Sequence, residues 1–207
     1  MSARIGLFDY GSGNLHSAAR AFANAGADVV VTSDLAELGR RDALVVPGVG
    51  AFAACMSGLR AAGGVELIRD WVAAERPLFG ICVGHQVLFA GGTEHGTHAD
   101  GVGLFPGTVG ELPARRLPHM GWNTVQAPAG SRLFAGLEGE RFYFVHSYAA
   151  AEGPEDGVVS TARHEDATFV AAVERGPVSS TQFHPEKSGA AGARLIANWL
   201  SALSDRV

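Results

Sequence analysis

The chain has few cysteines, no cluster of basic residues and no long apolar run, and each of these features excludes a class of protein. Two cysteines among 207 residues are too few for a disulfide framework, so we expect free thiols. Asp and Glu number 21 against 16 Lys and Arg, which gives a formal charge of −5, and the basic residues are scattered. We therefore expect neither nucleic acid nor an anionic membrane as a partner.

The N-terminus does not have the pattern of an export signal. Residues 1–4 lead directly into a short strand-like run rather than into a signal-peptide apolar region. No apolar run approaches the roughly 20 residues of a membrane-spanning helix. We expect a cytoplasmic protein without a membrane segment. The hydrophobic share of 47% is sufficient for a sizeable core, and we expect residues 1–207 to form a single domain.

Strand-like and helix-like segments alternate through the first half of the chain. Continuous apolar strands that alternate with helices predict an α/β fold with a mostly parallel central sheet and helices on both faces. Residues 87–90 are expected to be helical, and residues 91–103, rich in Gly, Thr and His, to form a loop. The expected strands are residues 4–10, 28–32, 42–46 and 77–82, and the expected helices are residues 15–25, 34–39, 51–62 and 65–75.

The second half has a different pattern, with short strands joined by turns and a final helix at residues 188–204. These strands predict additional antiparallel or mixed pairing. The helix carries an apolar face at helical spacing. The expected strands are residues 109–112, 121–125, 141–148, 158–162, 169–173 and 178–183, and the apolar face is Leu195, Ile196, Trp199, Leu200 and Leu203.

A cysteine lies in a glycine-flanked turn directly after the fourth expected strand, in Gly80-Ile81-Cys82-Val83-Gly84. A strand, a sharp turn and a helix in succession are typical of a nucleophile elbow. Glycine is needed on both sides because a Cβ there would collide with neighbouring backbone. The start of a helix also favours a thiolate. The alternative is an unreactive buried cysteine, which is how we interpret Cys55.

A thiol nucleophile needs a base, and the base needs a group that orients it. His184-Pro185-Glu186 follows the last expected strand, at the sheet edge where Cys82 is also expected. Glu186 is close enough in sequence to reach the second imidazole nitrogen, so the three side chains form a plausible triad. For the oxyanion, backbone N–H groups are available at Val83 and in the glycine-rich turn that contains Val49 and Gly50. The alternatives are a surface histidine and a turn without a ligand.

Two other patterns do not predict sites. Gly11-Ser12-Gly13 follows the first strand but lacks the third glycine of a dinucleotide-binding loop. His95 and His98 have no accompanying Cys or carboxylate pattern with zinc spacing. We expect neither a metal nor a cofactor.

These motifs together resemble the class I, or triad, glutamine amidotransferases, which have a flavodoxin-like α/β fold. A narrower match resembles the glutaminase subunits of imidazole glycerol phosphate synthases, from histidine biosynthesis, and spans residues 9–188. The first resemblance rests on residues 77–86 and 183–186. The second rests on Asp9-Tyr10-Gly11-Ser12-Gly13-Asn14-Leu15, Pro47-Gly48-Val49-Gly50-Ala51-Phe52, His119-Met120-Gly121-Trp122-Asn123, Phe144-Val145-His146-Ser147-Tyr148 and residues 183–188.

The resemblance implies an enzyme that hydrolyses L-glutamine to glutamate and ammonia through a Cys82 thioester. His184 then protonates the departing ammonia and activates water. The resemblance also implies that Glu94 meets the α-ammonium group of glutamine, a role that suits a carboxylate. The implied substrate-binding residues are Gly48, Gln86, Glu94, Ser147 and Tyr148.

The resemblance further implies a partner, a cyclase that uses the ammonia to make imidazole glycerol phosphate and aminoimidazole carboxamide ribotide. A phosphate-sugar domain does not fit within 207 residues, so the cyclase is expected to be a separate chain in a heterodimer. Loops around the expected site mouth carry the interface candidates, and Trp and Tyr are favoured interface anchors. The candidates are Tyr10, Asn14, Trp122 and Lys187.

Three alternatives remain beside this prediction. The chain could be the glutaminase of another synthase, such as anthranilate synthase, although the Tyr-Gly-Ser-Gly-Asn and His-Met-Gly-Trp-Asn segments argue against it. It could be a non-catalytic binding module on the same scaffold, although the complete set of Cys82, His184 and Glu186 argues against that. A cysteine peptidase on a similar fold is the weakest alternative.

Overall fold

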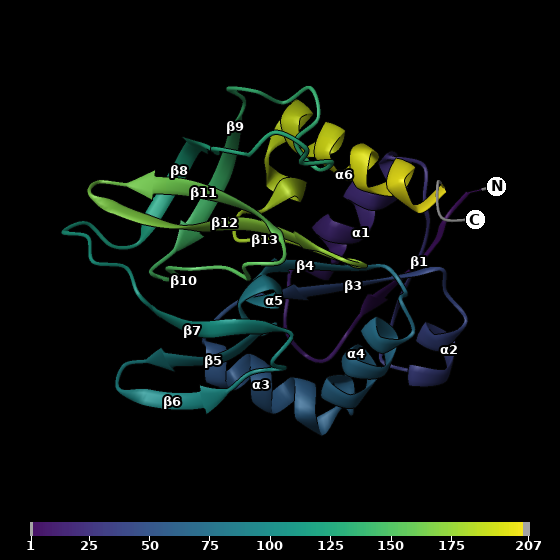
Figure 1. Ribbon diagram of the computed structural model, residues 1–207. Helices are drawn as coiled ribbons and strands as arrows, with labels where there is room; N and C mark the ends of the chain where they lie inside the picture. The colour runs from purple at the N-terminus through teal and green to yellow at the C-terminus, as the bar shows by residue number, and fades with distance from the viewer. Residues whose placement is uncertain (1, 205–207) are drawn as a thin grey trace.

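A seven-stranded sheet forms the centre of the computed structural model, which describes residues 2–204 (Figure 1). Its order is β11-β12-β13-β4-β3-β1-β2. The five strands from β13 to β2 are parallel, whereas β11 and β12 extend one edge in antiparallel pairing. The bounds are β1 (Arg4–Phe8), β2 (Asp28–Thr32), β3 (Ala43–Gly48), β4 (Leu78–Cys82), β11 (Val158–His164), β12 (Ala167–Arg175) and β13 (Val178–Thr181).

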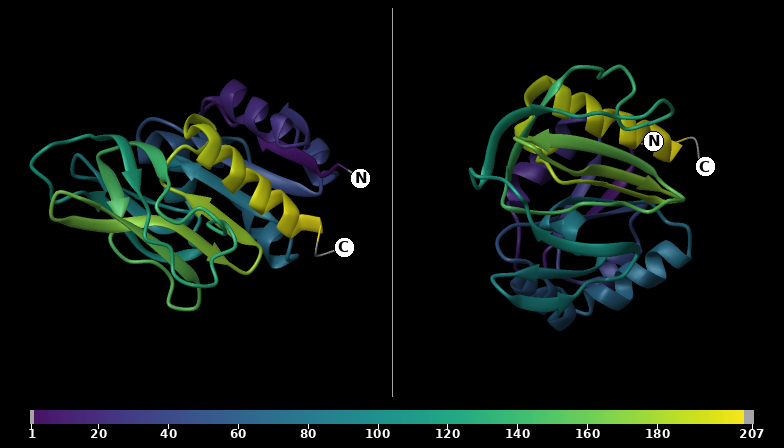
Figure 2. Two further views of the ribbon diagram at one scale, coloured as in Figure 1. Left: turned by 90° about the horizontal axis from the view of Figure 1, so that it is seen from above. Right: turned by 60° about the vertical axis from the view of Figure 1, so that its left-hand side comes forward.

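Helices cover both faces of this sheet. α1 (Leu15–Asn24) and α6 (Gly189–Ser204) lie on one face, and α2 (Leu35–Gly39), α3 (Phe52–Ala61) and α4 (Gly64–Ala73) lie on the other (Figures 1 and 2). Aromatic rings join α1 and α6 to the sheet, because Phe79 of β4 contacts both Phe22 of α1 and Trp199 of α6. The predicted α/β fold, with its mostly parallel central sheet between helices, is confirmed.

Local sequence sets the helix ends. The Asn14 side chain accepts a hydrogen bond from the Ser17 N–H at the start of α1, and Asp34 does the same for the first turn of α2. Gly26 lies just past α1 at φ +99°, a conformation that favours glycine at a helix end. In the described part of the chain, no helix is long and apolar enough to cross a membrane.

Two smaller sheets are built mainly from the second half of the chain, as its strand pattern predicts. One has the order β10-β7-β5-β6 and lies beside α3, and the other is the β8–β9 ladder near the start of α6 (Figure 1). All their pairs are antiparallel except β5 with β7. The bounds are β5 (Phe89–Glu94), β6 (Thr97–Asp100), β7 (Phe105–Glu111), β8 (His119–Thr124), β9 (Arg141–His146) and β10 (Tyr148–Ala150).

Two expectations for residues 87–103 are wrong. The helix after Cys82 is the single turn α5 (Val83–Gln86), and residues 91–103 form most of the β5–β6 hairpin instead of a loop. Close packing accounts for the difference. A Cβ on Gly92 would lie 2.6 Å from the Phe52 ring, and one on Gly101 would lie 2.0 Å from the Phe89 carbonyl oxygen. The glycines that suggested a loop allow this hairpin to approach its neighbours.

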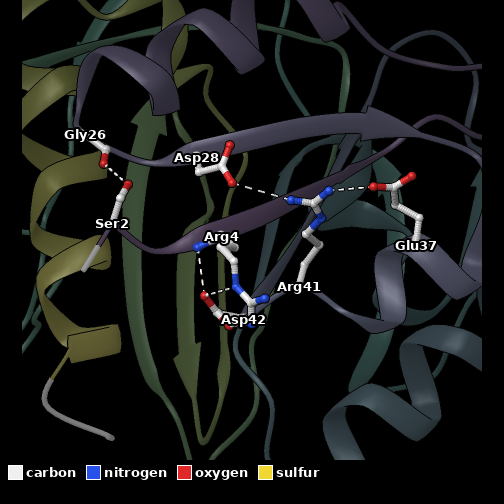
Figure 3. A network of polar contacts seen from close by, with 7 residues as sticks. All are labelled: Ser2, Arg4, Gly26, Asp28, Glu37, Arg41 and Asp42. Atoms are coloured by element: carbon white, nitrogen blue, oxygen red, sulfur yellow. Dashed lines mark hydrogen bonds and ion pairs between the residues drawn. The ribbon is translucent and has the colours of Figure 1, made fainter.

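Charged residues lie at the edge of the central sheet where the parallel strands begin (Figure 3). Arg4, which opens β1, forms an ion pair with Asp42 just before β3, and Arg41 bridges Asp28 of β2 and Glu37 of α2. The Arg4–Asp42 pair is exposed on both sides, and an exposed ion pair contributes little free energy. The candidate site lies at the other edge of the sheet, where the same strands end.

Candidate active site

Cys82 is the last residue of β4, and its backbone has the strained conformation φ 56°, ψ −113° before α5 begins at Val83. This conformation is uncommon for a non-glycine residue and is found where a site requires it. The flanking glycines are essential for it. A Cβ on Gly84 would lie 1.9 Å from the Val46 carbonyl oxygen, and one on Gly80 would lie 2.7 Å from the Gly84 carbonyl oxygen. The predicted elbow, including the steric reason for its glycines, is confirmed.

His184 and Glu186 form a buried pair beyond the end of β13. His184 precedes the 3-10 helix η1 (Pro185–Lys187), and this turn brings Glu186 back beneath the imidazole. His184 Nδ1 and Glu186 Oε1 are 2.7 Å apart, and each side chain is 3% exposed. A carboxylate on Nδ1 fixes the ring orientation and leaves Nε2 for the pocket.

The backbone of His184 is also held from behind. Its N–H donates to the Tyr143 carbonyl oxygen, and its own carbonyl oxygen accepts from the Ser188 hydroxyl. Burial lowers the pKa of the imidazole, but interactions with Cys82 and Glu186 outweigh it and raise the pKa to about 9. Near neutral pH the ring is therefore protonated, with the Cys82 sulfur on one side and the Glu186 carboxylate on the other.

A cavity of about 560 Å³ opens over these residues. That volume is typical of small-molecule sites. It is lined by the side chains or backbone of Cys82 and His184 and by eight further predicted site residues. They are Val49, Gly50, Val83, Gln86, Glu94, Ser147, Tyr148 and Lys187.

Gln86 lies in the pocket wall with its amide orientation fixed. Its Nε2 donates to the Tyr148 carbonyl oxygen at 2.8 Å and to Gln182 Oε1 at 3.0 Å. Both N–H bonds are therefore used within the protein, and the amide oxygen is left to accept from a ligand. Gln182 was not among the predicted residues, although it lies directly beyond β13.

Glu94 ends β5 and reaches the start of α3. Its Oε2 accepts from the Phe52 N–H at 2.8 Å, which satisfies one of the free donors of that helix. Glu94 therefore caps a helix as well as lining the cavity. This structural role is a second reason for a carboxylate at the position, and the sequence pattern did not reveal it.

The Val49 N–H does not act as a free oxyanion donor in this structure. It donates to Ser12 Oγ at 3.2 Å, and the Val49 carbonyl oxygen accepts from Ser12 Oγ at 2.9 Å and from Cys55 Sγ at 3.2 Å. Gly50 follows at φ +90°. Val83 begins α5, where the backbone N–H has no partner within the helix. Sequence reasoning missed Ser12 and treated Cys55 only as a packed helix residue; their contacts depend on the meeting of two loops.

Gly48 is not among the residues that line the cavity, and a Cβ there would lie 2.6 Å from the Gly84 backbone nitrogen; it packs closely under the elbow, and its substrate-binding role stays a prediction. Tyr10 cannot anchor an interface because it is only 6% exposed and its hydroxyl donates to the Pro47 carbonyl oxygen at 2.6 Å. Asn14 is exposed, and Trp122 is 50% exposed.

The site's chemistry follows from the groups it brings together. Within residues 2–204, no group of three or more His, Cys, Asp or Glu residues is arranged to hold a metal ion. A thiol on a strained turn, an imidazole and an orienting carboxylate provide a nucleophile, a proton carrier and its support. Such a combination can perform acyl transfer through a covalent intermediate.

Comparison with known proteins agrees with this chemistry. Residues 6–203 match the family model "Glutamine amidotransferase class-I". "Imidazole glycerol phosphate synthase subunit HisH" of Cutibacterium acnes (strain DSM 16379 / KPA171202) is 59% identical over 202 residues, which are 97% of this chain and 98% of that protein. The protein of the same name from Leifsonia xyli subsp. xyli (strain CTCB07) is 56% identical over 210 residues, covering 98% and 100%. A solved structure described as "Crystal structure of glutamine amidotransferase" has a TM-score of 0.77 at 21% identity over 97% of this chain and 98% of that chain, and so supports the fold.

Proposed function

This chain belongs to the class I glutamine amidotransferases, and from that premise we propose how its site works. It is the glutaminase subunit of an imidazole glycerol phosphate synthase in histidine biosynthesis. The observation that carries the mechanism is the strained Cys82 elbow in one pocket with His184, whose Nδ1 is held by Glu186. We assign Cys82 as nucleophile, His184 as proton carrier and Glu186 as its orienting carboxylate.

In the first half-reaction, the Cys82 thiol transfers its proton to His184, and Cys82 Sγ attacks the side-chain carbonyl carbon of L-glutamine. The tetrahedral oxyanion collapses by breaking the C–N bond, and His184 supplies the proton with which the nitrogen leaves as ammonia. Water then attacks the thioester while His184 accepts one of its protons. The second collapse expels the Cys82 thiolate and releases glutamate. The raised pKa of His184 suits the first proton transfer, because the ring is protonated when needed.

The oxyanion requires donors that are aimed at the developing charge. The Val83 N–H is one, since it directly follows the nucleophile at the start of α5. The second comes from the turn at Val49 and Gly50. Because the Val49 N–H is bound to Ser12 Oγ, we infer that this donor becomes available only after the turn moves.

Glutamine binding requires groups that match both ends of the molecule. We assign the α-ammonium to Glu94, whose carboxylate lines the pocket. Ser147 and Tyr148 also line the pocket, and the Gln86 amide oxygen is free to accept from the substrate. No cofactor is required for this hydrolysis.

The partner is a cyclase subunit on a separate chain, because this chain spans nearly the whole length of relatives that are named as subunits. We propose a heterodimer of the two chains that passes ammonia to the cyclase. Trp122 and its neighbour Met120 are exposed on β8, at 50% and 62%, and provide an apolar docking surface. Lys187, at the end of η1, lines the pocket, and Asn14 is exposed at the start of α1; we propose both as further interface residues. A cytoplasmic location and a single domain over residues 1–207 complete the proposal, and the two unpaired thiols suit a reducing compartment.

The test combines binding and activity. The chain should copurify with the cyclase, and the complex should form imidazole glycerol phosphate with L-glutamine as the nitrogen source. Trp122→Ala should weaken the complex by at least about tenfold in Kd, as is typical of an aromatic anchor that becomes buried in an interface. Leu35→Ala, at an exposed apolar residue of α2, is the matched control and should not. Failure to bind any cyclase would overturn the proposed partner.

A further inference from the structure

Two buried histidines outside the triad lie opposite each other in the β8–β9 ladder. His119 and His146 are register partners and are only 5% and 7% exposed. His119 Nδ1 and His146 Nε2 are 3.0 Å apart. His146 also lines the cavity, and His119 lies behind it. The proposed mechanism uses neither residue.

The hydrogen bonds around this pair allow one arrangement of protons. The Tyr148 carbonyl oxygen can only accept, so His146 Nδ1, at 3.1 Å, must donate to it. In the neutral ring, His146 Nε2 is then an acceptor, and His119 Nδ1 must donate to that nitrogen. His119 Nε2 in turn accepts from Asn123 Nδ2 at 3.2 Å. Asn123 is itself fixed, because Nδ2 donates to the Arg163 carbonyl oxygen and Oδ1 accepts from the Thr124 N–H.

An added proton would break this arrangement, because two N–H groups would then face each other somewhere along it. The surroundings oppose such a proton. Phe144 and Phe169 pack on both rings, and His164 stacks on His119 with the centroids 4.4 Å apart. Burial, with a smaller contribution from the neighbouring histidines, lowers the pKa of His119 to about 4 and that of His146 to about 3. Near neutral pH both rings are neutral.

The arrangement ends at the substrate wall. The Tyr148 carbonyl oxygen accepts from His146 and also from Gln86 Nε2. We propose that His119 and His146 are positioning residues, which hold the Tyr148 carbonyl so that the Gln86 amide presents its oxygen to bound glutamine. This inference rests on the proposed function and adds two residues that do not touch the reacting atoms. It also gives β8 two roles, since Met120 and Trp122 are exposed on the other side of the same strand.

Two conservative variants of His146 separate positioning from packing. His146→Asn places an amide nitrogen near the position of Nδ1 and keeps a donor for the Tyr148 carbonyl oxygen. His146→Gln places its amide near the position of Nε2, so it can accept from His119 but leaves that carbonyl with one donor fewer. Loss of one such hydrogen bond should raise the glutamine KM about fivefold in His146→Gln and leave kcat within about twofold. His146→Asn should keep KM within about twofold of wild type.

Direct binding provides a second readout. In a Cys82→Ser background, the glutamine Kd measured by calorimetry should show the same ranking as the KM values. His164→Leu is the control for packing in the cluster, because His164 stacks on His119 but donates nothing toward Tyr148. His119→Leu, which removes the donor to His146, should raise the Kd by less than His146→Gln does.

The outcomes distinguish this inference from the proposed function. A wild-type complex without glutaminase activity would overturn both. Active wild type with equal KM and Kd in His146→Asn and His146→Gln would overturn only the positioning role. A His164→Leu variant that weakened glutamine binding as much as His146→Gln would also overturn it, because packing would then account for the effect.

Discussion

Ser12→Ala tests whether the turn that carries the candidate oxyanion donor is held closed. The Ser12 hydroxyl accepts from the Val49 N–H at 3.2 Å and donates to the Val49 carbonyl oxygen at 2.9 Å. It therefore fixes one residue through both of its backbone polar groups. Alanine removes the hydroxyl without adding volume. We expect the isolated chain to be a poor glutaminase, activated by its cyclase partner, and we expect this variant to be partly relieved of that restraint.

The magnitude follows from the two hydrogen bonds. A neutral hydrogen bond contributes about 1 kcal/mol net, so losing two favours the released turn by about 2 kcal/mol, or roughly 30-fold in population. The ceiling is set by the oxyanion donor, whose removal typically costs about 100- to 1000-fold in rate. We therefore expect basal kcat/KM to rise between about 5- and 30-fold, since Cys55 still contacts the Val49 carbonyl oxygen.

The assay is glutamate release by the isolated chain and by the complex with saturating cyclase and its nucleotide ligand. Activity in the complex should change little, because the partner already favours the released turn, so the activation factor should shrink. Ser17→Ala is the matched control, since Ser17 accompanies Ser12 near the start of α1 but only its backbone N–H takes part in a described bond. Unchanged or lower basal activity in Ser12→Ala would refute the restraint. Equal activity of wild type with and without cyclase would refute a regulated oxyanion site.

Three further predictions concern single side chains. Glu94→Ala should raise the glutamine KM more than it lowers kcat, and it should destabilise the fold by about 1 kcal/mol because the helix cap is lost. Glu94→Gln should keep most of the stability but should still raise the KM. An unchanged KM would show that another carboxylate holds the amine. Because the pKa of His184 is raised from 6.5 to about 9, its proton stabilises the fold below pH 6.5 and this contribution, as much as about 3 kcal/mol, is lost as pH rises through 9. Denaturant unfolding across that pH range should show this loss, and the loss should be smaller in Glu186→Gln. If the free energy of unfolding fell equally steeply with pH in wild type and Glu186→Gln, the stabilising role of the His184–Glu186 pair would be contradicted. Gly84→Ala should fail to fold or lose activity, because its Cβ would overlap the Val46 carbonyl; a stable, active variant would refute the steric account of the elbow.

Local chemistry was sufficient to predict much of the fold and the position of the nucleophile. Apolar runs of strand length identified each parallel strand. The glycines around Cys82 have steric reasons that depend on only a few neighbouring residues, so the elbow could be inferred from the sequence. The last helix was predicted with its buried face, including Leu195 and Trp199, because helical spacing alone specifies it.

What the sequence did not predict depends on contacts between distant segments. Gly92 suggested a loop, but it lies in a strand where the Phe52 ring leaves no space for a side chain. Tyr10 is of a residue type that is favoured at interfaces, and only the tertiary structure shows that it is buried. His119 and His146 become a pair only once the β8–β9 register is known. Along β8, the inward residues His119, Gly121 and Asn123 alternate with the exposed residues Met120, Trp122 and Thr124, and this alternation was the available signal for that strand.

Substitution of the nucleophile tests the central claim most directly. The complex of the Cys82→Ser chain with its cyclase should be assayed with L-glutamine and, separately, with added ammonia. The account predicts that glutamine-dependent formation of imidazole glycerol phosphate disappears while ammonia-dependent formation remains at the wild-type rate, because a serine hydroxyl at the elbow lacks the readily formed thiolate. Glutamine-dependent activity in a folded Cys82→Ser complex would contradict the account, because the amide would then be cleaved without the Cys82 thioester.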